Sequence, residues 1–242
     1  MNWSPVNTYL AGLGLPELPR EAAERFEIYA RRLIEENEKY NLTAVTDPDE
    51  VVIRHFADSL TPAAYLPQDA RRFIDVGCGA GFPGLPLKIY LDAIRGETHT
   101  LTMLDATGKK TEFLRMMCEE MGVSGGEPLQ GRAEELGHDP ARRERYDAVL
   151  SRAVASMDKL DELCLPLCRV GGVFLALKSA AGREECEKAA SGLAKLGASA
   201  PEFFPYQLPG DQPESLAVRI RKCKPTPAAY PRAFGAIKKR PL

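Results

Sequence analysis

The 242-residue sequence has no apolar run that could cross a membrane, because a spanning helix needs about 20 consecutive apolar residues. Its first residues also lack the basic region and apolar stretch of a secretory signal. Its composition, with 44% hydrophobic and 27% charged residues, suits one compact domain with a small attached element. We therefore expect a soluble, cytoplasmic and monomeric protein.

Cysteine and histidine are scarce, with six and three residues respectively. Cys164 and Cys168 stand four apart in a segment expected to be helical, but no nearby Cys or His pair completes a four-ligand zinc set. We therefore expect buried, reduced thiols and no metal site.

Net charge is only −2, but the charges are unevenly distributed. Residues 1–70 carry twelve acidic and six basic side chains, whereas residues 219–242 carry eight basic ones and no acidic one. A basic end favours binding to phosphate backbones through counterion release. A merely solvated terminus would give the same composition.

Two amphipathic helices are predicted near the N-terminus. Apolar side chains recur at helical spacing over residues 17–40, and Asp47-Pro48 has the N-cap and first-turn residues of a second helix. We expect an N-terminal helical element over 1–66, a main domain over 67–224 and a basic tail over 225–242.

From about residue 72, short apolar runs alternate with helix-like segments. The runs lie at 73–76, 101–105, 146–150 and 173–177, and the helical segments at 85–94, 108–121 and 156–168. Such alternation predicts an α/β fold with a mostly parallel sheet, covered by helices on both faces. A further strand, the third in chain order, is expected just before Gly131, and residues 203–204 and 216–220 look like a final hairpin, so the sheet is expected to have seven strands.

A glycine-rich loop, residues 75–84 (DVGCGAGFPG), follows the first run directly and leads into a helix. The dinucleotide-binding fingerprint requires a glycine at the sixth position, but Phe82 stands there. An acidic residue two before Gly77, followed by Gly-x-Gly-x-Gly through Gly79, is instead typical of Rossmann-like methyltransferases. A tight strand-to-helix turn without a ligand is the alternative interpretation.

Polar residues follow three further strands, at the sheet edge where such folds bind ligands. Asp105 can accept both ribose hydroxyls of a nucleoside, or it can cap the next helix. Ala133 and Glu134 follow the third strand, where an adenine would lie, although Glu134 can also cap a turn. Arg152 ends the fourth strand and can serve the site or form an ordinary ion pair.

Together these segments resemble the bacterial 16S ribosomal RNA guanine-N7 methyltransferase family, also called the glucose-inhibited division protein B family. The similar blocks are YNLTAVTDP (40–48), RHFADSL (54–60), the glycine loop continued to Leu87, SRAVA (151–155), LALK (175–178) and the tail YPR…KKRPL (230–242). Departures from the family pattern are Cys78, Asp105-Ala106-Thr107-Gly108 and Ile237. The last leaves the path of the tail open.

The resemblance implies a Rossmann-like class I methyltransferase that transfers a methyl group from S-adenosylmethionine to guanine N7 in small-subunit ribosomal RNA. By the same resemblance, the cofactor contacts are Gly77, Gly79, Phe82, Asp105, Ala133, Glu134 and Arg152, with Arg152 also a candidate for positioning. The expected RNA contacts are His55, Lys178, Arg232, Lys238, Lys239 and Arg240. His55 could instead have a packing role, and Lys178 could be an exposed strand end.

No acid–base constellation is evident, and guanine N7 needs none because its lone pair is already free. His99 and His138, at apparent edge or loop positions, are not expected to be catalytic. Three rival functions stay open: a nicotinamide oxidoreductase, a methyltransferase for a small molecule or protein, and a non-catalytic RNA-binding factor with this fold.

Overall fold

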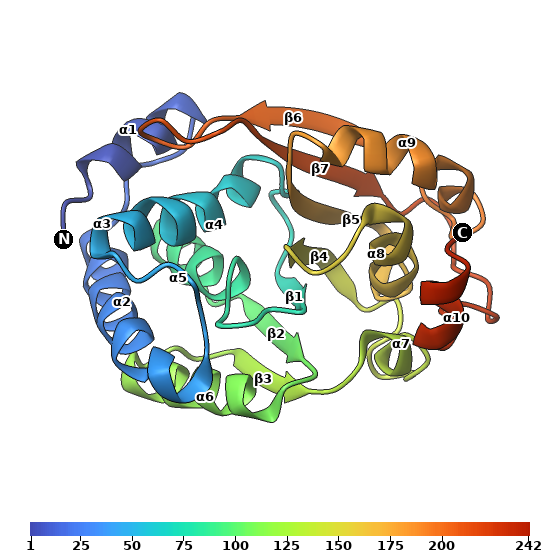
Figure 1. The fold of residues 1–242 in the computed structure, drawn as a ribbon, viewed down its shortest axis with the longest axis horizontal. Coiled ribbons are helices and arrows are strands. Elements are labelled where there is room, and N and C mark those ends of the chain that lie inside the picture. The colour runs from blue at the N-terminus through green and yellow to red at the C-terminus, as the bar shows by residue number, and fades with distance from the viewer.

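The computed structural model describes residues 1–242 and contains one seven-stranded sheet with helices on both faces (Figure 1). The strand order is β3-β2-β1-β4-β5-β7-β6, with β1 to β5 parallel and β7 antiparallel to both neighbours. The strands are β1 (Arg72–Val76), β2 (Thr100–Asp105), β3 (Gly126–Gln130), β4 (Tyr146–Arg152), β5 (Cys168–Ser179), β6 (Glu202–Tyr206) and β7 (Ser215–Arg221). The predicted fold class is confirmed.

Successive strand residues point to opposite faces, so each apolar run contributes to two cores. Phe73 packs with the N-terminal residues and with the helices α5 (Gly84–Arg95) and α6 (Gly108–Glu120). The next residue, Ile74, packs on the other face. The helices of that face are α7 (Ala133–Leu136), α8 (Met157–Cys164), α9 (Gly182–Leu193) and α10 (Phe234–Lys239).

The N-terminal element is helical, as predicted, and is packed into the first of these cores. It comprises α1 (Ser4–Gly12), α2 (Arg20–Tyr40), α3 (Pro48–Val51), a π-helical segment η1 (Val52–Ala57), α4 (Asp58–Leu60) and a 3₁₀ turn η2 (Thr61–Ala64). The Asp47 carboxylate accepts the amides of Asp49 and Glu50, so the expected N-cap is confirmed. The boundaries at 66 and 224 stay a prediction.

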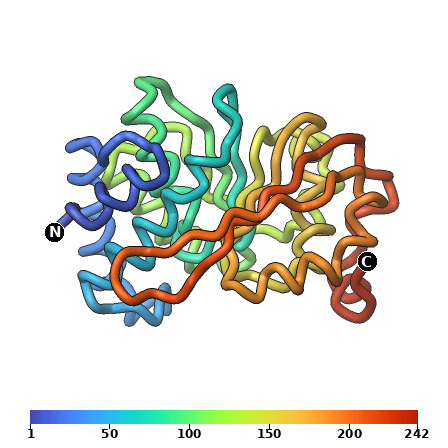
Figure 2. The backbone as a smooth tube through the Cα atoms, turned by 90° about the horizontal axis from the view of Figure 1, so that it is seen from above, coloured from blue at the N-terminus to red at the C-terminus, as the bar shows by residue number.

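The β6–β7 hairpin extends from the far side of the sheet to the N-terminal element (Figure 2). There the Tyr206 hydroxyl donates to Asp58 Oδ1 at 2.6 Å, and Phe204 stacks on Tyr65 at 4.3 Å between ring centroids. This contact joins segments about 150 residues apart, and it completes one side of the candidate site.

Several expected details differ. The helix predicted at 156–168 ends at Cys164, and Cys168 already belongs to β5, because the chain must turn at Pro166 to return to the sheet. Helices α1 and α9 were not anticipated. Five cysteines are buried as expected, but Cys223 is exposed. No helix is both long and apolar enough to span a bilayer.

Candidate active site

The glycine loop connects β1 to α5 and requires glycine at three positions. Gly77, Gly79 and Gly81 have φ of +71°, +59° and +98°, a region that L side chains rarely adopt. Asp75 closes the loop, because its Oδ2 accepts the Gly84 amide at 2.8 Å. Burial raises the pKa of Asp75 to about 7, and its Oδ1 is buried without a partner.

Asp105 ends β2 beside this loop. Its Oδ2 accepts the Gly79 amide at 3.0 Å, and its Oδ1 accepts the Thr107 amide at 2.8 Å. The N-cap of α6 is Thr107, so Asp105 shapes the approach to the helix without capping it. A Cβ added to Gly79 would meet open space. A carboxylate beside an open glycine at the carboxyl edge of a parallel sheet fits the ribose of a nucleoside.

Ala133 and Glu134 begin α7, directly after β3, so the structure places them at the same edge of the sheet as Asp105. Ala133 is buried, and Glu134 is partly exposed. The Glu134 side chain lies in the first turn of α7, and α7 has no side-chain cap. Glu134 therefore does not cap this helix, as the alternative interpretation would require.

Arg152 links the end of β4 to the N-terminal element. Its guanidinium pairs with Asp58 Oδ2 at 2.7 Å, donates to the Arg54 carbonyl at 3.0 Å and lies 5.3 Å from the Phe82 ring centroid. Asp58 is 8% exposed, so this pair is largely shielded from water. Arg152 thus forms a partly buried ion pair and also lines the candidate site, and its role as a site residue stays a prediction.

His55 and Phe82 form the contact between η1 and the glycine loop. Their rings stack at 4.6 Å, and Phe82 also stacks on Tyr29 at 5.1 Å. Burial, with Arg152 nearby, lowers the pKa of His55 to about 4, so its imidazole is neutral at physiological pH. Because Phe82 is buried, its backbone is the part it can offer a ligand.

Lys178, near the end of β5, is mostly buried, with a side chain 10% exposed. Its ammonium donates to the Ala155 carbonyl at 2.8 Å and pairs with Glu185 Oε2 at 2.7 Å. The structure therefore does not leave it as an exposed strand end.

A cavity of about 600 Å³ opens between the N-terminal element, the ends of β4 and β5, and the β6–β7 hairpin. Its charged and aromatic lining is Arg54, His55, Asp58, Arg152, Lys178, Glu185 and Tyr206. The sequence did not single out Asp58 or Tyr206, because nothing in the pattern indicates that the hairpin reaches this side.

The basic C-terminal segment is largely built into the fold. Lys222 is buried and donates to the Leu165 and Leu196 carbonyls. Arg232 forms a two-bond ion pair with buried Glu162, and Ile237 of α10 is fully buried. Lys238, Lys239 and Arg240 are exposed and make no ion pair. Of the four predicted RNA contacts in the tail, these three are therefore free to meet phosphate.

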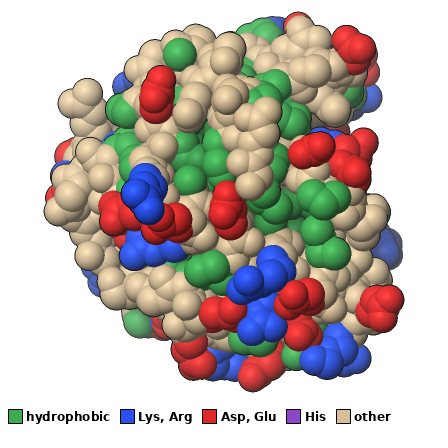
Figure 3. Space-filling model, turned by 90° about the vertical axis from the view of Figure 1, so that its left-hand side faces the viewer, with side chains coloured by type: hydrophobic (Ala, Val, Ile, Leu, Met, Phe, Trp, Pro, Cys, Tyr) green, Lys and Arg blue, Asp and Glu red, His purple; other side chains and the backbone are tan.

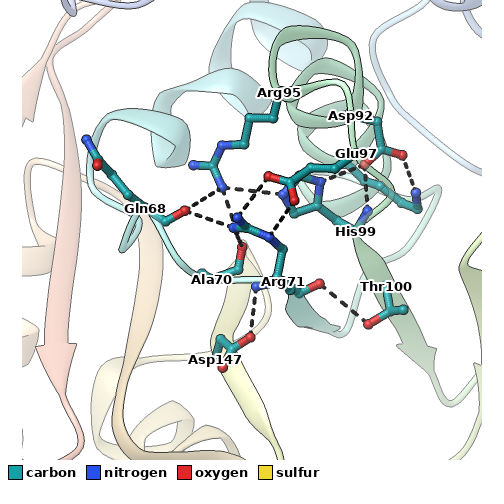
Figure 4. Close-up of polar contacts among 10 residues, drawn as sticks. Gln68, Ala70, Arg71, Asp92, Arg95, Glu97, His99, Thr100 and Asp147 are labelled. Carbon is teal, nitrogen blue, oxygen red and sulfur yellow. Dashed lines mark hydrogen bonds and ion pairs between the residues drawn. The ribbon is translucent and has the colours of Figure 1, made fainter.

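The other two histidines do not line the cavity. His99 is fully buried, with its Nδ1 2.7 Å from Asp92 Oδ1, in the polar cluster at the amino end of β1 and β2 (Figure 4). His138 Nε2 lies 2.7 Å from the Pro231 carbonyl oxygen. No three His, Cys, Asp or Glu side chains are arranged to hold a metal ion.

The glycine loop, the carboxylate after β2 and the sheet order together define a Rossmann-like methyltransferase. A family model described as rRNA small subunit methyltransferase G (GidB) matches residues 22–206, and the chain belongs to this family. The resemblance predicted from the sequence is therefore confirmed.

Relatives named ribosomal RNA small subunit methyltransferase G agree with this assignment. The one from Exiguobacterium sibiricum is 43% identical over the whole of both chains, and that from Bacillus cereus is 40% identical over 100% of this chain and 99% of its own. Among solved structures, a Bacillus cereus O-methyltransferase in complex with SAH has a TM-score of 0.56, with 16% identity over 91% of this chain and 98% of its own. This last likeness supports the fold alone.

Proposed function

We propose that this protein transfers a methyl group from S-adenosylmethionine to N7 of a guanine in small-subunit ribosomal RNA, as a monomer in the cytoplasm. The main support is the glycine loop, in which Asp105 lies beside Gly79 and the space next to Gly79 is open, in a chain of the rRNA small subunit methyltransferase G family. The donor supplies an electrophilic methyl group. Gly77, Gly79, Asp105, Ala133 and Glu134 would hold it.

The residues at the site suit transfer to N7. The N7 lone pair accepts a methyl group without losing a proton, so the acceptor needs alignment and no general base. His55 is neutral and packed on Phe82, and the Arg152 guanidinium is bound to Asp58. We assign these side chains to positioning.

The acceptor base would enter the cavity of about 600 Å³, which lies beside the glycine loop at the ends of β4 and β5. Its volume suits one nucleobase with part of its ribose. Its carboxylates are matched by cations, namely Asp58 by Arg152 and Glu185 by Lys178. Such a polar lining can hydrogen-bond both the donor and the acceptor groups of a guanine.

The exposed cations Lys238, Lys239 and Arg240 would hold RNA phosphates. The face formed by the N-terminal element is a poorer candidate, because acidic and basic side chains intermix there (Figure 3), as in the Arg32–Glu120 pair. We propose His55 and Arg232 only as secondary RNA contacts, since each is engaged within the protein.

Replacing the three exposed tail cations together, as Lys238→Gln/Lys239→Gln/Arg240→Gln, should weaken RNA binding by about tenfold at low salt and leave S-adenosylmethionine affinity unchanged. Each lost phosphate contact should also reduce the slope of log affinity against log salt, by about 0.7 for single-stranded RNA. Filter binding over a salt series measures both. Substitution tests the tail cations more specifically than truncation, because truncation would also remove buried Ile237 and the Arg232–Glu162 pair.

The matched control is Arg20→Gln/Arg25→Gln/Arg31→Gln on α2, which removes the same charge from the mixed face. Equal loss of RNA affinity in the two triple variants would contradict a specific role for the tail.

The deciding experiment for the function is methylation of 16S RNA, and of small subunits, that lack the modification. The expected result is labelled methyl on one guanine, located by base mapping. Transfer to a small molecule or protein instead, or donor binding without turnover, would overturn the proposal in favour of a rival. Binding of NADH in place of S-adenosylmethionine would do the same.

A further inference from the structure

The segment between β4 and α8, residues Ala153–Ser156, has a strained backbone conformation that contacts with other elements must stabilise. Ala153 has φ +55°, a left-handed value that costs about 1 kcal/mol or more for a residue with a Cβ. The next side chain, Val154, lies against the glycine loop. A Cβ added to Gly77 would come within 2.5 Å of Val154 Cγ2, although Val154 itself is 41% exposed. The segment is therefore one wall of the donor site.

Two side chains from other elements hold this wall. The Lys178 ammonium of β5 donates to the Ala155 carbonyl at 2.8 Å and pairs with Glu185 Oε2 of α9 at 2.7 Å. The same Glu185 oxygen accepts the Met157 amide at 3.0 Å. One ion pair thus connects two backbone groups, on either side of Ser156, to the sheet and to a helix. A non-glycine residue keeps a left-handed conformation only where surrounding contacts fix the backbone, and the contacts of Lys178 and Glu185 do this for the segment.

The pair is also fixed in place. The Lys178 and Glu185 side chains are 10% and 29% exposed, so water competes weakly for their charges. Helix α9 begins directly against the lysine, since a Cβ on Gly182 would come within 2.6 Å of Lys178 Cβ. A lysine held in this way has little freedom to swing out toward a phosphate.

We propose that Lys178 and Glu185 form a latch that holds the Ala153–Ser156 wall against the glycine loop and so positions the methyl donor. Lys178 is then a positioning residue for the donor and not a contact for RNA. The inference rests on the proposed function, because it takes the glycine loop to be the donor site.

The test measures donor and RNA affinities separately on the full chain. Lys178→Met and Glu185→Ala should each raise the Kd for S-adenosylmethionine about tenfold in calorimetry. Both residues also line the proposed acceptor cavity, but the Kd for unmodified 16S RNA should stay within about twofold, because phosphate contacts supply most of that affinity. The double variant should be no worse than either single variant, because both remove the same latch. Lys178→Arg, which keeps the charge and the donors, should recover most of the affinity.

Glu184→Gln and Lys188→Met are the matched controls, since both residues are exposed on α9 next to the latch. They should bind the donor like the unsubstituted protein. A loss of RNA affinity in Lys178→Met with unchanged donor affinity would overturn the latch, as would additive effects in the double variant. If the unsubstituted protein binds the donor but does not methylate 16S RNA, the proposed function fails, and the donor affinities of the variants still decide the latch.

Discussion

Asp105→Ala should lower S-adenosylmethionine affinity by about 100-fold, with the fold retained. Asp105 is 8% exposed and stands at the end of β2, where its carboxylate would accept both ribose hydroxyls. Two charge-assisted hydrogen bonds lost from a partly desolvated site correspond to about 3 kcal/mol, which is about 100-fold in affinity. Calorimetric titration with S-adenosylmethionine measures the change.

Part of this loss would come from the protein itself, because Asp105 also holds the Gly79 and Thr107 amides. Asp105→Asn separates the two effects. It keeps the shape and one acceptor oxygen but turns an N–H₂ group toward one of its partners. An intermediate loss is expected for it, and Glu119→Gln on the exposed side of α6 should have no effect. Wild-type affinity in Asp105→Ala would contradict the ribose assignment.

The sheet and the donor side of the site were predictable because their signals are local. A parallel strand covered on both faces is largely apolar, and residues 73–76 and 101–105 are apolar apart from Asp75, Thr102 and Asp105. The glycine loop needs positive φ at three positions, which leaves a trace in the sequence. Asp105 and Arg152 were found because each is the last residue of such a strand.

The acceptor side was not predictable, because its contacts join distant segments. Tyr206 reaches Asp58 across 148 positions, and Arg152 reaches Asp58 across 94. Charge counting also misjudged the tail, since composition does not reveal that Lys222 is buried or that Arg232 is paired with Glu162. Helix α9 was not predicted, although Cys186, Ala189 and Leu193 stand at helical spacing.

Gly81→Ala should have the largest effect on stability, a loss of about 3–5 kcal/mol. At φ +98° an alanine is strained by about 1–3 kcal/mol. Its Cβ would also collide with the Tyr29 hydroxyl and lie 2.7 Å from Leu114 Cδ2, and such overpacking adds about 1–3 kcal/mol. Tyr29 cannot move aside easily, since it is fully buried and its hydroxyl donates to the Ala80 carbonyl. Urea unfolding measures the change.

Gly79→Ala separates backbone strain from collision within the same loop. Its φ of +59° strains an alanine in a similar way, but a Cβ there meets no protein atom within 4 Å. We expect a stability loss of only about 1 kcal/mol, together with a large loss of S-adenosylmethionine affinity, since the new methyl group would enter the space left for the donor. Gly81→Ala should mainly destabilise the fold, whereas Gly79→Ala should mainly obstruct donor binding. Gly81→Ala should therefore lose more stability, and Gly79→Ala should lose more S-adenosylmethionine affinity. If Gly79→Ala bound the donor normally, the open side of the loop would not be the donor site.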